Sequence, residues 1–367
     1  MKNKVILTAS DFWYLWNFRL RLINELTLKG WDVILVSSKV SGFVENDLAL
    51  PGSVKFIDLG FRSHGVNLFS EGVVFLKLLC IFGWSRPSFI LSFTPKMNFY
   101  SSLICLALRF RLIANVSGQG SLKNGKHFLI GAYRGLSRFL LSKAFYVFFQ
   151  NDYDMLSMDL KGTNFSVLPG SGIDIDRFTY GYNESTKLEV FMACRLIREK
   201  GVEDFLACAA MFSGDNRIEF VLAGIADSSP RSVPESFIRD CCADVSNLSF
   251  IGAVDCIQHA AESCHVFILP SYYAEGTPKF LLEGLSMGKI IITTDTPGCR
   301  DTVCSNDNGF FVDAQAPQMI KDALSSILAM SNDQRVSMSV KSRELAVNRF
   351  DERFVLNRYF DILALRT

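Results

Sequence analysis

The chain has 367 residues, with 38 Lys and Arg against 37 Asp and Glu, which gives a formal net charge of +1. This length predicts two domains, and the balanced charge argues against nucleic acid as a general partner. Hydrophobic residues make up 49% of the sequence, so a largely disordered chain is excluded. The ten cysteines form no CxxC pair, so we expect reduced thiols in a cytoplasmic protein and no metal site.

The first half of the chain alternates short apolar runs with longer amphipathic segments, a pattern typical of parallel strands joined by helices. The expected strands are 5–9, 32–37, 55–59, 89–93, 112–116 and 146–150. A polar segment from Tyr180 to Lys187 then interrupts the pattern, and we place the linker there. The N-terminus lacks a small-residue cleavage site and the apolar stretch Val73–Trp84 is too short to span a bilayer, so we expect neither a secretion signal nor a membrane-spanning helix.

The second half repeats the alternation of strands and helices. The expected strands are 188–193, 219–223, 248–251, 266–270, 290–294 and 310–312, with helices over segments such as 203–212 and 279–287. Residues 333–365 are helical in pattern and end in an apolar face that must bury against something. We therefore predict an α/β protein with two Rossmann-like domains facing across a cleft. The expected ranges are an N-terminal, acceptor-binding domain over 1–178, a C-terminal, nucleotide-sugar-binding domain over 188–345 and a C-terminal helix over 346–367 that returns to pack on the N-terminal domain.

One loop in the second half has the layout of a ligand site. The expected strand 266–270 runs into a loop in which Pro278 suits the first turn of a helix. Ligands of parallel sheets bind outside the carboxyl ends of the strands, and a helix start there favours a diphosphate. Glu275 in the loop and Glu283 in the helix are too far apart to share one spot, so they would hold different parts of one extended ligand. A nucleotide sugar, with its sugar, diphosphate and ribose, has that layout.

A second strand end carries two cations. Arg195 and Lys200 lie between an expected strand and the helix that follows it, where they can stabilise the charge of a departing diphosphate. Taken singly, both this pair and the pair of glutamates fit solvated surface residues better. The prediction of a site therefore depends on their combination.

The chain resembles, over nearly all of its length, the retaining glycosyltransferases of family 4, which have the two-domain GT-B fold. The most specific match is the E-x7-E motif from Glu275 to Glu283, and Arg195 with Lys200 match the donor-phosphate pair. The segment Leu168–Asp174 is similar to the end of the family's N-terminal domain. This resemblance implies transfer with retention of configuration and no need for a metal cofactor.

The resemblance also implies roles for single residues. Glu275 would contact the donor hexose and Glu283 the ribose, while Arg195 and Lys200 would neutralise the leaving nucleoside diphosphate. We expect a UDP-sugar as the favoured donor. The implied catalytic residues are Glu275, Arg195 and Lys200, and the implied donor-binding residues are Glu283, Gly276, Thr277, Lys279, Phe280, Leu281 and Gly172.

Within the family, the sequence is most similar to bacterial enzymes that build capsule and O-antigen polysaccharides on undecaprenyl-diphosphate carriers. The matching segments are Trp16–Arg19 in the expected first loop, Ser92–Lys96 and Val116–Leu122. They imply a lipid-linked saccharide acceptor on the N-terminal side, near Asn17, Arg19, Thr94, Lys96, Gly118 and Gly120. Ser10–Trp13 replaces the family's Gly-Gly turn, and Ser92 or Thr94 replaces a common histidine, so no residue that activates the acceptor is identified.

The segment 125–149 combines basic and apolar residues. Arg134 and Arg138 are four residues apart and share a face if this segment is helical. A basic amphipathic helix can lie on an anionic leaflet, so we expect peripheral contact with the inner face of a bacterial plasma membrane. The alternative is a helix of the domain with a solvated basic edge.

The resulting hypothesis is a glycosyltransferase that moves a hexose or N-acetylhexosamine to a lipid-linked saccharide. Two alternatives use the same ligand class: a non-hydrolysing sugar-nucleotide 2-epimerase of the same fold, and a sugar-nucleotide-binding protein without catalysis. The E-x7-E motif disfavours the first, and the full set of Arg195, Lys200, Glu275 and Glu283 disfavours the second. The donor sugar stays open, because pocket shape and a few hydrogen bonds distinguish one sugar from another.

Overall fold

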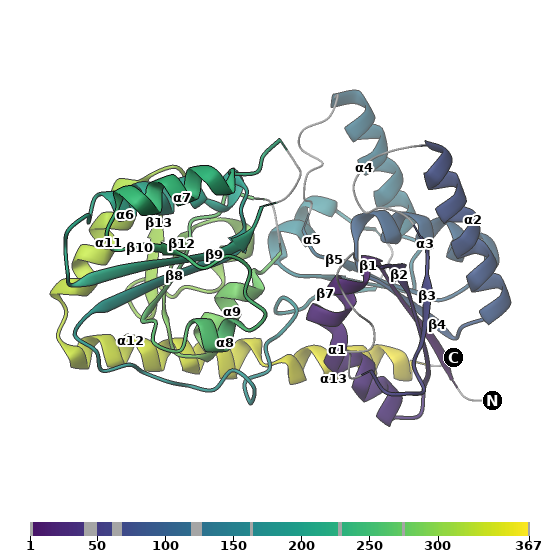
Figure 1. Cartoon of the computed structure of the whole chain (residues 1–367). Helices are drawn as coiled ribbons and strands as arrows, with labels where there is room; N and C mark the ends of the chain where they lie inside the picture. The colour runs from purple at the N-terminus through teal and green to yellow at the C-terminus, as the bar shows by residue number, and fades with distance from the viewer. Residues whose placement is uncertain are drawn as a thin grey trace. The chain divides into compact units, whose positions relative to one another are not determined.

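The computed structural model describes residues 3–39, 50–60, 68–118, 127–161, 164–226, 230–273 and 276–365. The chain forms two compact units. Unit 1 contains Met1–Ser171 with Leu356–Thr367, and unit 2 contains Gly172–Val355. Each unit holds one parallel sheet with helices on its faces, which confirms the predicted α/β class (Figure 1).

The sheet of unit 1 has seven strands among the described residues, in the order β3-β2-β1-β4-β5-β6-β7. The order reverses between β1 and β4, where Rossmann-like sheets bind their ligands. The sequence predicts six of these strands but not β7, which has only three residues and ends the sheet. The bounds are β1 (Lys4–Asp11), β2 (Asp32–Ser38), β3 (Lys55–Asp58), β4 (Phe89–Ser92), β5 (Leu112–Val116), β6 (Tyr146–Phe149) and β7 (Phe165–Val167).

Helices cover both faces of this sheet (Figure 1). On one face, α2, α3 and α4 lie side by side, and the buried core there joins Ile90 of the sheet to Val74, Ile104 and Leu141 of these helices. On the other face lie α1 and the part of α13 from Leu356 onwards. The bounds are α1 (Phe12–Leu28), α2 (Leu68–Ser85), α3 (Pro95–Leu108), α4 (His127–Leu141), α5 (Asp152–Met158) and α13 (Glu352–Ala364).

The C-terminal helix packs on unit 1, as predicted. Tyr359 of α13 is fully buried, with its ring centroid 4.9 Å from that of Phe148 and 6.5 Å from that of Phe93. Its hydroxyl donates a hydrogen bond to Asn115 Oδ1 on β5. Burial raises the pKa of Tyr359 to about 12, so the phenol stays protonated at neutral pH. The apolar face noted in the sequence therefore completes the core of the first unit.

Unit 2 repeats the order of the first six strands of unit 1, as β10-β9-β8-β11-β12-β13, and its described residues form no counterpart of β7. Its order reverses between β8 and β11. The strands are β8 (Leu188–Arg195), β9 (Ile218–Ile225), β10 (Leu248–Phe250), β11 (Val266–Leu269), β12 (Ile290–Thr294) and β13 (Gly309–Val312). The helical segments are η3 (Arg198–Lys200), α6 (Val202–Ala210), α7 (Glu235–Asp244), α8 (Ile257–Ala260), α9 (Lys279–Ser286), α10 (Pro297–Arg300), α11 (Pro317–Ala329), α12 (Asn332–Leu345) and η4 (Ala346–Phe350).

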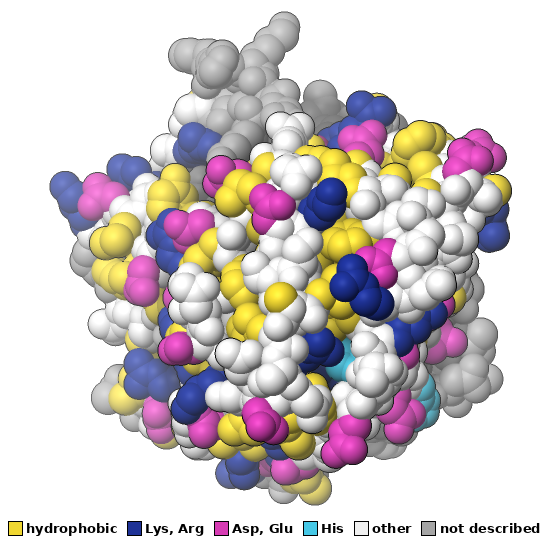
Figure 2. Space-filling view, turned by 90° about the vertical axis from the view of Figure 1, so that its left-hand side faces the viewer, with side chains coloured by type: hydrophobic (Ala, Val, Ile, Leu, Met, Phe, Trp, Pro, Cys, Tyr) yellow, Lys and Arg dark blue, Asp and Glu magenta, His cyan; other side chains and the backbone are white. Residues whose placement is uncertain are grey.

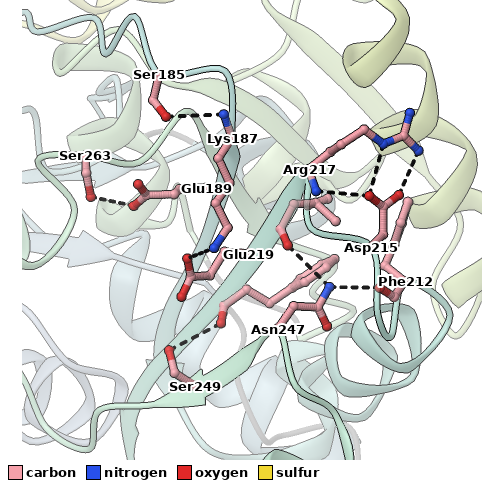
Figure 3. A network of polar contacts seen from close by, with 12 residues as sticks. Ser185, Lys187, Glu189, Phe212, Asp215, Arg217, Glu219, Asn247, Ser249 and Ser263 are labelled. Carbon is pink, nitrogen blue, oxygen red and sulfur yellow. Dashed lines mark hydrogen bonds and ion pairs between the residues drawn. The ribbon is translucent and has the colours of Figure 1, made fainter.

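Polar contacts brace the starts of the strands in unit 2 (Figure 3). Lys187 Nζ lies 2.6 Å from Glu219 Oε2, and Ser263 Oγ donates to Glu189 Oε2 at 2.5 Å. The side-chain amide of Asn247 donates to two backbone carbonyls, at 2.9 and 3.3 Å. At this end of the sheet the polar side chains are thus engaged with one another, and the candidate site lies at the opposite, carboxyl end.

The division between the units differs from the expected linker at 180–187. Ile173, Ile175 and Phe178 are buried in the core of unit 2, so this unit begins at Gly172. The polar segment that follows packs on the same unit, where Asn183 Nδ2 donates to Ser263 O at 2.7 Å. The polar segment is therefore a surface segment of unit 2 and not a linker, because the apolar residues before it and after it are both buried in the core of that unit.

One local prediction is wrong, namely that Trp16–Arg19 belong to a loop. They lie inside α1, which starts directly after β1 because Asp11 Oδ1 accepts a hydrogen bond from Tyr14 N at 2.8 Å and caps the helix. In the segment 125–149, α4 ends at Leu141 and the expected strand follows as β6. No helix among the described residues is long and apolar enough to cross a membrane.

Candidate functional site

The candidate site in unit 2 lies where β8 and β11 end side by side. These two strands pair in parallel, with Val190 opposite Val266. Arg195 is the last residue of β8, and the segment Ser271–Tyr273 follows β11. This is the point at which the strand order reverses, so side chains from both strand ends face one region.

Three cations gather around one aromatic ring. The guanidinium carbon of Arg195 lies 5.6 Å from the centroid of the Tyr273 ring, Lys200 Nζ lies 5.7 Å from it, and the guanidinium carbon of Arg231 lies 5.8 Å from it. Lys200 is only 8% exposed. The structure thus brings together the two cations that the sequence predicts and adds a third from the loop before α7. Three positive charges close together can stabilise a diphosphate.

Glu199 ties these elements together. Its backbone carbonyl accepts hydrogen bonds from Tyr272 N at 2.9 Å and from Tyr273 N at 3.2 Å. Its carboxylate Oε1 lies 3.3 Å from an Arg231 guanidinium nitrogen. These contacts therefore connect the turn η3, the loop after β11 and the loop before α7, and they hold the side chain of Arg231 beside the turn that carries Lys200.

Gly201 explains why η3 can lie so close to β11. Its φ is +79°, and a Cβ at this position would lie 2.5 Å from Pro270 Cγ and 2.6 Å from Pro270 O. Any side chain would have both the strained backbone and the clash. Glycine after Lys200 is therefore required to hold the ammonium group near the end of β11.

The helix α9 begins at the end of the connection that follows β11, the strand end described above. Pro278 precedes the helix and no side chain caps it. Thr277 is buried, Gly276 is also buried, and Glu275 lies outside the described residues. The side chains of Phe280 and Leu281 point into the core, where the Phe280 ring stacks on Phe267 at 4.5 Å. Only the backbone groups of these two residues are therefore suited to contact a ligand.

Glu283 is a buried carboxyl group, with 7% exposure. Burial raises its pKa, against the opposing effects of Lys279 and Arg177. Lys279 Nζ lies 3.9 Å from Glu283 Oε1. The oxygens of this carboxyl group can accept hydrogen bonds, which suits the hydroxyls of a sugar.

Gly172, the remaining donor-side prediction, has a packing role in the structure. Its φ is +75°, and a Cβ there would lie 2.5 Å from Glu352 Cα. This glycine therefore allows the chain to pass close to the start of α13.

The acceptor-side predictions fall in unit 1, and two of them lie in α1. Asn17 is half-buried and Arg19 is 2% exposed, with its guanidinium carbon 4.7 Å above the Phe93 ring. Arg19 is thus part of the interior beneath the end of β4, next to the buried Tyr359. In this position its cation is shielded from solvent by aromatic rings.

Thr94, Lys96 and Gly118 lie at the carboxyl ends of β4 and β5. Thr94 Oγ1 accepts a hydrogen bond from Ser10 N at 3.1 Å and lies 2.8 Å from Ser10 Oγ, so the two strand ends flanking the reversal point are joined. Lys96 Nζ lies 2.6 Å from Glu71 Oε1. Gly118 has a φ of +108°, and Gly120 lies outside the described residues.

Sequence reasoning missed Arg231, Tyr273 and Glu199. Glu199 stands between Arg195 and Lys200, and Tyr273 stands in the loop just before Glu275, so their proximity to the site had a sequence signal. Arg231 had none, because it lies in a loop between β9 and α7 with no motif around it. Only the folded sheet brings this residue next to Tyr273.

The positive charge of the site is local. On the face of unit 2 drawn in Figure 2, acidic and basic side chains alternate, with hydrophobic ones between them. Many surface charges of this unit are paired, such as Arg217 with Asp215 at 2.7 Å and Arg239 with Glu235 at 2.5 Å. An anionic ligand would therefore be attracted by the cations at Tyr273 rather than by a charged surface.

Comparison with known proteins shows which protein family the second unit matches. The family described as "Glycosyl transferases group 1" matches residues 174–345. Over its length the chain is 25% identical to the N,N'-diacetylbacillosaminyl-diphospho-undecaprenol alpha-1,3-N-acetylgalactosaminyltransferase of Campylobacter jejuni, covering 95% of each chain. It is 20% identical to the capsular polysaccharide biosynthesis glycosyltransferase CapM of Staphylococcus aureus, covering 91% of this chain and 90% of that protein.

Solved structures agree on the fold. The sucrose-phosphate synthase of Thermosynechococcus elongatus aligns with a TM-score of 0.79 and 14% identity, over 99% of this chain and 98% of that one. HepE of Anabaena, solved in complex with UDP, aligns with a TM-score of 0.78 and 14% identity, over 99% of this chain and 100% of that one. These similarities confirm the predicted GT-B architecture of two Rossmann-like units. The chain carries a glycosyl transferase group 1 domain over residues 174–345, and the protein is a glycosyltransferase.

Proposed function

We propose that the protein transfers a hexose or N-acetylhexosamine from a nucleoside-diphosphate sugar, with a UDP-sugar favoured. The observation that carries this proposal is the convergence of Arg195, Lys200 and Arg231 on the Tyr273 ring. When the bond between the anomeric carbon and the diphosphate breaks, negative charge develops on the leaving oxygen. Preorganised cations at that position lower the barrier without reorganising during the reaction.

The other donor contacts follow from the strand-to-helix connection at α9. Glu275 would contact the hexose and Glu283 the ribose, with backbone groups at Gly276, Thr277 and Phe280 facing the sugar and phosphates. The uncapped start of α9 supports the phosphate part of this arrangement. Retention of anomeric configuration and independence from metal ions belong to the same proposal, because cationic side chains take the role that a metal has elsewhere.

For the acceptor, we propose a lipid-linked saccharide of bacterial surface polysaccharide biosynthesis, such as capsule or O-antigen. The Campylobacter relative is named for an acceptor linked to diphospho-undecaprenol, and the Staphylococcus relative for capsular polysaccharide. The acceptor would bind in unit 1 at the ends of β4 and β5, where Thr94, Lys96 and Gly118 lie.

The surface of unit 1 supports contact with an anionic membrane. On α4, Arg134 and Arg138 are exposed beside the exposed side chains of Leu136 and Phe139. On α2, an apolar stripe is exposed at helical spacing: Phe69, Val73, Leu76, Cys80 and Trp84. Cations next to apolar side chains suit the boundary between headgroups and acyl chains, so we place the protein in the cytoplasm at the inner face of the plasma membrane.

Incubation with radiolabelled nucleotide sugars and a bacterial lipid extract tests the reaction. We expect label in the lipid fraction, undiminished by EDTA. Epimerised nucleotide sugar would identify a 2-epimerase, and bound but unchanged donor would identify a binding protein; either result would refute the proposal. Flotation with anionic vesicles tests the membrane contact, and a protein that stays at the bottom of the gradient would exclude it.

A further inference from the structure

The carboxyl-terminal end of α9 is completed by a residue from another helix. The carbonyl oxygens of residues 283–285 accept hydrogen bonds from the backbone N–H groups of residues 287–289. The carbonyl of Ser286, the last residue of α9, accepts from Arg343 Nη1 at 2.7 Å. Arg343 belongs to α12, and α9 has no basic residue of its own in its last turn. Arg343 therefore supplies the positive charge that the carboxyl end of a helix favours.

The same guanidinium also binds the turn formed by residues 175–178. Its Nη2 donates to Ile175 O at 3.0 Å, and its Nη1 donates to Phe178 O at 2.9 Å. Ser286 Oγ donates to Phe178 O as well, at 2.6 Å, and lies 2.8 Å from Nη1 of the arginine. The side chain of Arg343 thus fastens this turn to the end of α9 through carbonyl groups of both.

Glu283 lies on the face of α9 that meets this turn. Glu283 and Ser286 are three residues apart, so their side chains share a face of the helix, and both are buried. Arg177 lies in the turn, next to Phe178. Burial raises the pKa of Glu283, and the charges of Lys279 and Arg177 oppose that rise. A shift of the turn along α9 would therefore change the electrostatic surroundings of this carboxyl group.

We propose that Arg343 is a positioning residue for donor binding. It holds the turn 175–178 against α9 and thereby fixes Glu283 and Arg177 at the place where the ribose of the donor binds. The proposal rests on the proposed function, in which Glu283 contacts the ribose, and adds a residue that acts through Glu283. A guanidinium suits this role because its planar set of donors can bind several carbonyl groups at once, in a fixed geometry that an ammonium group lacks.

The helix α12 also contains a matched control. Arg335 donates from Nε to Ile327 O at 3.1 Å and from Nη2 to Leu328 O at 3.2 Å. These carbonyls belong to the last turn of α11, a helix that carries none of the candidate site residues. Arg335→Gln and Arg343→Gln each remove a guanidinium that binds the end of a helix, but only the second change lies beside the helix that carries Glu283.

Binding of UDP, GDP and dTDP to the full-length protein tests the proposal, and the nucleotide that the unaltered protein binds most tightly serves for the variants. We expect Arg343→Gln to weaken binding by about ten-fold and Arg335→Gln by less than about two-fold, although both lower the melting temperature. Because Arg343 acts through Glu283, adding Arg343→Gln to Glu283→Ala should weaken binding by less than about two-fold further. Equal affinities of the two single arginine variants, or full additivity in the double variant, would overturn the proposal.

Arg343→Lys tests the same role with a smaller change, should Arg343→Gln fail to fold. It keeps a positive charge at the end of α9 but cannot bind both segments in the same geometry. With a labelled nucleotide sugar we expect KM for the donor to rise by about three-fold while kcat stays near normal. An unchanged KM, or a fall in kcat alone, would contradict the assigned role.

Failure of this proposal and failure of the proposed function give different results. Nucleotide binding needs no turnover, so a protein that shows the expected differences in affinity but transfers no sugar would refute the proposed function and leave the role of Arg343 standing. A protein that transfers sugar, with equal donor affinity in the two single arginine variants, would do the reverse. A protein that binds none of the three nucleotides would overturn both.

Discussion

The two units share the order of their first six strands but have different chemistry at the point where that order reverses. In unit 2, this point gathers three cations around Tyr273. In unit 1, it joins the neutral hydroxyls of Ser10 and Thr94, and the nearby cation, Arg19, is buried beneath Phe93. The topology therefore provides a place for a ligand in each unit, while the side chains at the strand ends decide which ligand is bound.

Some polar atoms at the two strand ends are satisfied and others are not. In unit 2, Thr293 Oγ1 donates to Leu269 O at 2.6 Å and Ser271 Oγ donates to Glu199 O at 3.2 Å. In unit 1, the buried hydroxyls of Thr8 and Ser92, which pair across β1 and β4, have no partner among the described residues. At the site of unit 2, Glu199 Oε2 is one such buried atom. Each such group costs about 1–3 kcal/mol, so both strand ends carry a cost of this kind.

Among the variants that test this difference between the two units, we expect Lys200→Ala to have the largest effect. Without this ammonium group the leaving diphosphate is less stabilised, and we expect turnover to fall by about 10²–10³-fold. The measurement is kcat with a labelled nucleotide sugar, and Lys187→Ala, on an exposed ion pair at the other end of the sheet, is the control. Near-normal turnover of a folded Lys200→Ala protein would remove the assigned role.

The interior of unit 1 is tested by Tyr359→Phe. This change removes the hydroxyl that donates to Asn115 and leaves a buried acceptor unpaired. We expect a loss of about 1–3 kcal/mol in the free energy of unfolding. Urea unfolding measures it, and Tyr153→Phe, on an exposed tyrosine of α5, is the control. Equal stability of both variants would show that the hydroxyl contributes nothing to the packing of α13.

The role of the Tyr273 ring in unit 2 is tested by comparing Tyr273→Leu with Tyr273→Phe. The phenylalanine keeps a ring beside the three cations, whereas the leucine does not. We expect kcat/KM for the donor to fall by about ten-fold in the leucine variant and to stay near normal in the phenylalanine variant. If both variants lose the same activity, the hydroxyl rather than the ring is the important group.

The smallest expected effect concerns the pH dependence of stability at Glu283. Burial raises the pKa of this carboxyl above its value in the unfolded chain, so the folded protein binds the proton more tightly. Its contribution to stability is therefore lost as pH rises from about 4.3 through the folded-state pKa. Glu283→Gln should show a weaker decline over that window. Melting temperatures across the pH range measure this, and parallel curves for both proteins would contradict it.

Much of the fold was predictable because burial patterns are local. Strands of a parallel sheet are buried on both faces, so β1, β5 and β12 appear in the sequence as short apolar runs. The edge strand β7 was missed, since three half-exposed residues leave no such pattern. The boundary at Ser171 was also hidden, because the unit that buries Ile173 depends on packing and not on local polarity.

The residues of the candidate site also fall into two groups, those that the sequence predicts and those that it does not. The cations Arg195 and Lys200 and the segment Glu275–Glu283 could be predicted from the sequence, because each motif is contiguous and spans one strand-to-helix connection. That Arg231 joins the two cations at Tyr273 and that Arg19 is buried could be seen only in the folded chain. The physical reason is that strand order, which no local pattern encodes, determines which distant side chains meet at the end of a sheet.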